Sequence, residues 1–428
     1  MACSKSAKNM VDFFSNAPDI VIDKILETLP IRIAARTSVL SKQWRHAWLS
    51  LKKLNFDADF WEEQKNIDES FIWRTNTDES LVWRKGCQII SDILFCHIGP
   101  VHDLDLYMPF EACKDRRDYR HWISFLSKNG VRKVVIRNQY VEMDITTYIF
   151  RCSELVHLEL SSFKLNPPPT DFIGFPYLKH LLLEDVNFIK QSIFCSLIEN
   201  CIMLETLKLV KWSGMDHIVI DVPSLQTLVL NGDFESLAFR NVRSLKSISL
   251  CLKRLPKKLR VETVDAVNLP ASSCQLQSIE FDGHLFLTAG DIIRPPPVTF
   301  IHLHELCLSN LNLSDFGVSR YLLLMIECCP YLKKLDIAVL PGENVGQDML
   351  DYNYSNKLVH LLEVNITGIT GTSAELKLVE YLFAISPVLK NLFFKSGYIG
   401  IESQVNMLES LMRFPRASTK ASLVCLKK

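Results

Sequence analysis

One stretch of the chain reads Leu155-Val156-His157-Leu158-Glu159-Leu160, with apolar residues at its first, fourth and sixth positions. The same apolar-x-x-apolar-x-apolar pattern recurs along most of the 428 residues, in steps of 20 to 31 residues. Recurrence at such a step predicts a protein built from stacked repeats. The first two copies are the weakest, and the copies begin at Val101, Val131, Leu155, Leu178, Leu204, Leu225, Leu245, Leu276, Leu303, Leu332, Leu361 and Leu389.

The spacing within each copy predicts a short strand. The last two apolar positions are two residues apart, so their side chains point to the same face of a strand. One strand buries too little alone, but stacked copies form a parallel sheet over one elongated core. Steps of 20–29 residues are typical of leucine-rich repeats. We therefore predict an α/β fold, a leucine-rich-repeat solenoid with parallel strands on its concave face. The two shortest steps, between Leu204 and Leu245, leave no room for a helix and predict loops.

The residues that alternate with the buried positions should face the concave side, through which solenoids usually bind their ligands. These residues are of mixed charge with an acidic tendency, which favours a protein or peptide target over a phosphate backbone. The predicted target-binding residues are His157, Glu159, Glu184, Lys208, Glu280, Asp282, Glu305 and Asp336.

The segment before the repeats follows a different pattern. Pro18 suits the first turn of a helix, and Asp19 complements the positive end of its dipole. Ile22, Ile25, Leu26 and Leu29 have helical spacing, and Pro30 ends the pattern. Three short helices within residues 11–50 cannot bury much surface alone. The segment is therefore either a cap of the repeats or a module that binds a partner.

Residues 17–48 resemble the plant F-box. The resemblance rests on Pro18-Asp19-Ile20-Val21-Ile22, on Ile25-Leu26-Glu27-Thr28-Leu29-Pro30-Ile31-Arg32, and on Ala35-Arg36-Thr37-Ser38-Val39-Leu40-Ser41-Lys42-Gln43-Trp44-Arg45 with Trp48. Two positions differ from the family: Ala17 replaces a leucine, and Ile33 replaces an acidic residue.

The C-terminal part resembles the FBD module of the same plant family. The resemblance rests on residues 371–383, on Ser386-Pro387-Val388-Leu389-Lys390 and on residues 413–418. Here Thr372 or Ser373 should begin a helix that Pro387 limits. The predicted organisation is an F-box at residues 11–50, a linker with the first elements at 51–100, leucine-rich repeats at 101–356, and an FBD-like repeat and cap at 357–428.

The resemblance implies a substrate-recognition subunit of a Skp–cullin–F-box ubiquitin ligase. The F-box would bind a Skp-type adaptor, and through it a cullin, while the repeats hold an unknown target protein. The implied adaptor-binding residues are Pro18, Ile20, Ile22, Ile25, Leu29, Pro30, Val39, Leu40 and Trp44. The departures at Ala17 and Ile33 keep an alternative open, a repeat scaffold that binds proteins but no longer engages the ligase.

Composition excludes several other classes of protein. Lys plus Arg and Asp plus Glu are both 48, so the formal net charge is zero, which disfavours nucleic acid as a partner. No apolar stretch predicts a membrane span or a secretory signal, so we expect a nuclear or cytoplasmic protein. The 13 cysteines contain no C-x-x-C pair, and no catalytic or phosphate-binding motif occurs. We predict a non-catalytic protein without metal or cofactor.

Two local features fall outside the repeats. Residues 68–74 recur as residues 78–84, which predicts a duplicated loop or, alternatively, a lobe of Trp and Arg side chains that contacts a partner. The basic cluster at 253–260 predicts a solvated loop, with a nuclear import signal or an anion site as the alternative.

Overall fold

The computed structural model describes residues 17–62, 80–109, 116–139, 143–252, 267–268, 275–287, 299–342, 352, 354–398 and 400–426. The chain forms two compact units. The first comprises Met1–Leu181 and Asp185–Ile189, and the second comprises Leu182–Glu184 and Lys190–Lys428. The first copy of the duplicated sequence and the basic cluster lie outside the described residues.

The first unit begins with a small helical module. Pro18 and Pro30 stand directly before its first two helices, where a missing N–H costs nothing. The helices bury one another through Ile22, Leu26 and Trp44. The module consists of α1 (Asp19–Glu27), α2 (Ile31–Arg36), η1 (Thr37–Val39), α3 (Trp44–Ala47) and η2 (Trp48–Ser50).

A parallel sheet follows the helical module within the same unit. Its strands join in the order β1 (Lys53–Phe56), β2 (Asp103–Met108), β3 (Lys133–Asn138) and β5 (His157–Ser161). Strand β1 precedes the first predicted repeat, and it pairs with β2 with Leu54 opposite Leu104. The segments between strands contain α5 (Ser80–Cys96), α6 (Arg116–Leu126) and η4 (Thr147–Arg151), and β4 (Met143–Asp144) pairs with β6 (Phe163–Leu165).

Strand β7 (His180–Phe188) contributes residues to both units. Shorter strands of the second unit form a separate sheet. Among the described residues of this unit, nine parallel strands follow one another in chain order. They are β8 (Thr206–Ser213), β10 (Thr227–Asn231), β12 (Ser247–Cys251), β14 (Ser278–Asp282), β15 (Glu305–Leu311), β16 (Lys334–Val339), β17 (Glu363–Ile369), β18 (Asn391–Ser396) and β19 (Ser422–Cys425).

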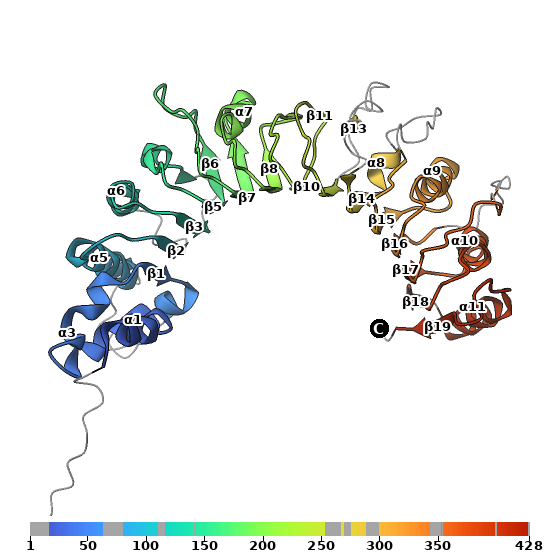
Figure 1. The fold of residues 1–428 in the computed structure, drawn as a ribbon, viewed down its shortest axis with the longest axis horizontal. Helices are drawn as coiled ribbons and strands as arrows, with labels where there is room; N and C mark the ends of the chain where they lie inside the picture. Colours follow the sequence, from blue (N-terminus) through green and yellow to red (C-terminus); the bar gives the residue numbers. More distant parts are fainter. Residues whose placement is uncertain are drawn as a thin grey trace, which may run out of the picture. The chain divides into compact units, whose positions relative to one another are not determined.

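Helices cover one face of this second-unit sheet (Figure 1). They are α7 (Ser192–Ile198), α8 (His284–Leu287), α9 (Phe316–Glu327), α10 (Ser373–Ile385) and α11 (Ile401–Arg413). Helix α10 begins at Ser373 with Thr372 as its N-cap, as predicted, and it ends before Pro387. Of the elements that the structure describes, no helix lies on the opposite face of this sheet (Figure 1).

The predicted register is observed across the second unit. One buried position of each repeat lies opposite the same position of the next, as in Leu207 beside Leu228 and Leu335 beside Val364. Their neighbours along each strand alternate between buried and partly exposed. The prediction of an α/β leucine-rich-repeat fold with parallel strands is confirmed.

The shortest repeats differ from the prediction. Between β8 and β12 we expected loops, and the described residues there contain no helix but do contain short strands. These strands, β9 (His217–Ile220) and β11 (Ser236–Phe239), pair in parallel and continue to β13 (Val267–Asn268). Ile218 and Leu237 are buried and adjacent in this small sheet. A strand needs fewer residues than a helix to cover the core, which suits repeats of 20 and 21 residues.

Candidate functional site

The helical module exposes large apolar side chains to solvent. Ile20 is 72% exposed, Val39 is 86% exposed and Leu40 is 45% exposed, while Val21 and Ile25 are also exposed. We call these five residues the apolar module surface. Exposed apolar side chains concentrated in one short segment are typical of interaction sites, because moving each one out of water is favourable. Pro18 and Pro30 are exposed and Leu29 is half-buried in the same module.

Two of the predicted adaptor-binding residues lie inside the helical module and not on its surface. Ile22 and Trp44 are almost completely buried and form the core of the module. Helical spacing places Ile22 on the inner face of α1 with Leu26, so Ile22 stabilises the module and does not present a surface. The prediction that these two side chains contact a partner is corrected. Val21, which was not predicted, is exposed.

The Gln43 side chain, directly before α3, fixes the position of the start of α1. The Gln43 Nε2 donates to the carbonyl oxygen of Ala17 at 2.8 Å and to Asp19 Oδ1 at 2.7 Å. The hydrogen bond to position 17 uses the backbone, so it tolerates alanine in place of leucine. Ala17 and Ile33 are both partly exposed.

The exposed sheet face of the first unit carries an ion-pair network. Arg137 Nη1 lies 2.8 Å from Asp105 Oδ1, and Arg137 Nη2 lies 3.1 Å from Glu159 Oε1. His157 lies beside Glu159, and the ring centroids of His157 and His180 are 5.7 Å apart. Burial, then the charges of Lys133 and His180, lower the pKa of His157, so His157 is neutral at pH 7. This part of the face is therefore close to electrically balanced.

The corresponding face of the second unit is more acidic. Adjacent strands place Glu305 and Glu363 on either side of Lys334, and Glu280 and Cys307 side by side. Lys334 Nζ lies 3.1 Å from Asp336 Oδ2, so Asp336 is compensated. The Glu280 Oε2 accepts a hydrogen bond from Ser249 at 2.7 Å.

The predicted target-binding residues separate into two groups. His157, Glu159, Lys208, Glu280, Glu305 and Asp336 lie on the exposed sheet face, and Glu184 is exposed in β7. Asp282 is only 1% exposed. It accepts from the backbone N–H of His284 at 2.8 Å and from Asn310 Nδ2 at 2.6 Å. Asp282 therefore holds the turn after β14, and its prediction as a target contact is corrected.

Two thiols that the sequence analysis did not select flank Glu280. Burial, and then the charge of the Glu280 carboxylate, together raise the pKa of Cys251 and of Cys307 to about 11. Strand alternation could have identified both residues, because they occupy the same face as the predicted ones. At pH 8 these thiols are protonated, and they should react slowly with alkylating reagents.

Removing the charge at position 280 should accelerate that reaction. We expect Glu280→Gln to lower the pKa of both thiols and to raise their iodoacetamide rates at pH 8.5 about 2- to 5-fold. Site-resolved mass spectrometry would measure the rates, with the exposed thiol Cys425 as the internal control. Unchanged rates at Cys251 and Cys307 would show that Glu280 does not influence them.

The described residues contain no group of three or more His, Cys, Asp or Glu side chains that could hold a metal ion. Among these residues, no helix has both the length and the apolar character needed to cross a membrane.

Comparisons with known proteins agree with this architecture. The leucine-rich repeats described for FBD-associated F-box protein At5g56370 match residues 119–280. The F-box/FBD/LRR-repeat protein At1g13570 of Arabidopsis thaliana is 31% identical over 97% of this chain and 99% of its own length. FBD-associated F-box proteins At4g10400 and At1g66310 of the same plant are 26% and 25% identical, over 80% and 99% of this chain and 81% and 98% of their own lengths.

Proposed function

Because this chain belongs to the F-box/FBD/LRR-repeat protein family, we propose that it is the substrate-recognition subunit of an SCF-type (Skp–cullin–F-box) E3 ubiquitin ligase. Residues 11–50 are the F-box, residues 51–100 connect it to the repeats, residues 101–356 are the repeats, and residues 357–428 are an FBD-like cap. The apolar module surface is the observation that carries the proposal.

The proposed adaptor contact is an apolar one. Full burial of a side chain such as Ile, Val or Leu stabilises a complex by about 1.5–3 kcal/mol. The module keeps its core intact through Ile22 and Trp44, so Ile20, Val39 and Leu40 remain available to a Skp-type adaptor. Pro18, Ile25, Leu29 and Pro30 complete the proposed contact.

The repeats hold the target in this proposal, and the chain itself performs no catalysis. A target bound to the exposed sheet face is kept near a ubiquitin-loaded enzyme that another subunit carries. The effective concentration of the target's lysine then rises without a catalytic group on this chain. We place this assembly in the nucleus or the cytoplasm.

Co-purification with a Skp-type adaptor tests the proposal. We expect the full chain to retain the adaptor stoichiometrically and a deletion lacking residues 11–50 to retain none. Cooperative thermal unfolding of the deletion variant would show that its repeats are folded. If the folded full chain retains no adaptor, the alternative is favoured, a protein-binding repeat scaffold in which Ala17 and Ile33 have ended ligase binding. Reversion of Ala17 to Leu should then restore retention.

A further inference from the structure

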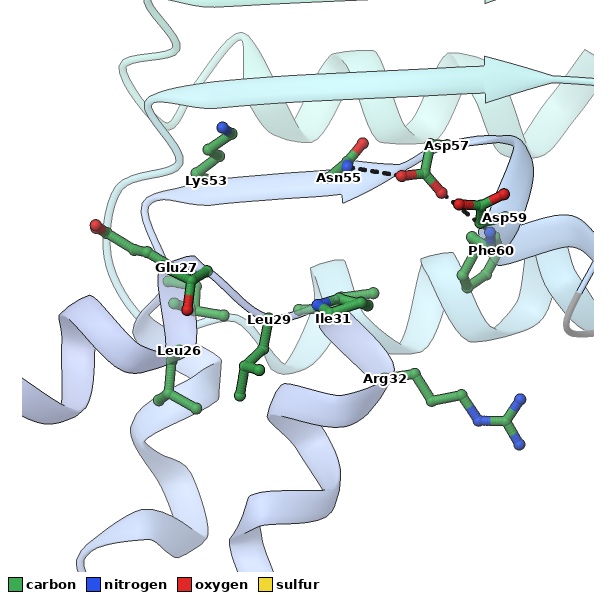
Figure 2. Close-up of a pocket in the computed structure, with 13 residues that line it drawn as sticks. Leu26, Glu27, Leu29, Ile31, Arg32, Lys53, Asn55, Asp57, Asp59 and Phe60 are labelled. Carbon is green, nitrogen blue, oxygen red and sulfur yellow. Dashed lines mark hydrogen bonds between the residues drawn. The ribbon is translucent and has the colours of Figure 1, made fainter.

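A pocket separates the helical module from the first strand of the sheet, within the first unit. Its volume is about 360 Å³, in the range of pockets that bind ligands. Leu29, Ile31 and Phe60 line it with apolar surface. Strand β1 forms the facing wall, with Lys53 near its start and Asp57 and Asp59 at its end (Figure 2).

The wall formed by β1 is an open strand edge. Strand β1 is the first strand of its sheet and pairs with β2 alone among the described strands. The backbone carbonyl of Lys52 accepts from His102 and Asp103, so Lys52 faces β2. In a parallel ladder alternate residues face opposite sides, so the backbone groups of Lys53 and Asn55 face the pocket. Within the described residues, no hydrogen bond uses these four outward N–H and C=O groups.

Carboxylates stand at one end of this edge. The Asp57 side chain is oriented by two hydrogen bonds, from Asn55 Nδ2 at 2.9 Å and from the Phe60 N–H at 3.1 Å. Asp59 is exposed beside it, whereas Glu27 lines the other end of the pocket, on the side of Lys53 (Figure 2), and Arg32 also lines the pocket. A carboxylate that accepts two hydrogen bonds still has lone pairs for a cation. This end of the pocket is therefore suited to a Lys or Arg side chain.

We propose that the pocket binds a partner protein through an extended peptide segment, which adds as a strand to the edge of β1. Main-chain hydrogen bonds to Lys53 and Asn55 supply most of the affinity, and Leu29 with the exposed edges of Ile31 and Phe60 adds a smaller apolar contact. A basic residue of the segment pairs with Asp57 and Asp59. The site shares Leu29 and Pro30 with the proposed adaptor contact and adjoins the exposed sheet face at Asn55, which lies opposite Asp105. The outward backbone groups of β1 belong to neither surface, so substitutions in β1 test this site separately from adaptor binding.

Two pooled peptide libraries test the binding and its charge preference. Each contains blocked hexapeptides of β-favouring residues, with Arg fixed at the last or first position in one pool and Glu in the other. We expect the immobilised full chain to retain the Arg pool at least ten-fold more than the Glu pool, as quantified by mass spectrometry. Equal retention of the two pools would overturn the charge assignment, and retention of neither would overturn the site.

A substitution in β1 tests the strand edge itself. Asn55→Pro removes the outward N–H, which an edge strand tolerates because β2 does not use it. Asn55→Ala is the matched control, since it removes the side chain and keeps the N–H. Both variants lose the hydrogen bond from Asn55 Nδ2 to Asp57, so the effect of the N–H is read from the difference between them. We expect Asn55→Pro to lower retention of the Arg pool at least ten-fold more than Asn55→Ala does. Equal binding by both folded variants would overturn strand addition.

The carboxylates are tested by Asp57→Asn combined with Asp59→Asn, which preserves an acceptor for the Phe60 N–H. We expect this variant to lose the preference for the Arg pool. A preserved preference would overturn the proposed pairing. Adaptor retention by Asn55→Pro should equal that of the unchanged chain, which separates failure of this site from failure of the ligase proposal.

Discussion

Simultaneous replacement of Val39 and Leu40 by Asp is expected to lower the affinity for a Skp-type adaptor by at least 100-fold. Both side chains are exposed, on and directly after η1, where the Leu40 N–H donates to the Thr37 carbonyl at 2.9 Å. Loss of one well-packed anchor typically costs about 2 kcal/mol, and 1.4 kcal/mol is a ten-fold change in affinity. The two new carboxylates must also lose water in an apolar contact, which adds to the cost.

The exposure of these two residues makes the experiment interpretable. Surface substitutions that do not disturb buried groups usually change the free energy of unfolding by less than about 0.5 kcal/mol. Ile202→Asp is a matched control, because Ile202 is 66% exposed in the second unit. Isothermal titration with the purified adaptor would measure the affinity. If the double variant binds like the unchanged chain while its thermal unfolding is preserved, these residues are not adaptor contacts.

The fold could be predicted from the sequence because the spacing of the leucines fixes which residues of neighbouring strands pair. Leu207, Leu228 and Ile248 occupy equivalent positions in three successive repeats and lie opposite one another in the sheet. The pattern has a period of two, so a shift by one residue would move every leucine to the solvent face. The second short sheet was missed because β9 and β11 are only four residues long.

The candidate site was less predictable, because the type of a residue does not determine whether its side chain points toward solvent or toward the core. Ile20 and Ile22 are two positions apart in one helix, yet Ile20 is exposed and Ile22 is buried. Asp282 alternates correctly with Phe281, but the strand ends there and the side chain turns inward to hold the next turn. Helical spacing separates Ile20 from Ile22, because two residues turn a helix by about 200°. The orientation of Asp282 depends on Asn310, which is distant in sequence, so periodicity alone could not predict it.

The pocket beside β1 illustrates the same limit. Lys53-Leu54-Asn55-Phe56 is too short for a confident strand pattern, and its first apolar partner, Leu104, lies 50 residues later. An open strand edge is a property of the assembled sheet, since it depends on which strand has no neighbour. No motif in the sequence could therefore have identified the outward backbone groups of Lys53 and Asn55.

Glu375→Ala is expected to destabilise the C-terminal repeats by about 3–5 kcal/mol. Glu375 is 2% exposed, and its Oε2 accepts from the backbone N–H groups of Thr370, Gly371 and Thr372 at 2.9, 2.7 and 2.8 Å. Removing the acceptor leaves three buried or partly buried donors unsatisfied, each at a cost of about 1–3 kcal/mol. The bond from the Thr372 N–H is one half of a capping box, and the other half, in which Thr372 Oγ1 accepts from the residue-375 N–H, keeps both of its groups in the variant.

Two further variants separate the hydrogen bonds from other effects of the substitution. Glu375→Gln keeps one side-chain oxygen and should lose about half as much stability. Glu380 is partly exposed on the same helix, so Glu380→Ala should change the free energy of unfolding by less than about 0.5 kcal/mol. Because long repeat arrays need not unfold in a single two-state step, hydrogen exchange should be followed for peptides that cover α10, β17 and β18.

Each repeat is stabilised by its neighbours, so faster exchange should spread from α10 into β17 and β18. The loss of stability caused by Glu375→Ala should leave adaptor binding unchanged, since the apolar module surface belongs to the first unit. Target binding should weaken if it uses the face of β16 and β17, where Asn365 donates to the Asp336 carboxylate. Exchange in α10 at the original rate would show that the three backbone donors find other acceptors, and that Glu375 is not required to hold the start of the helix.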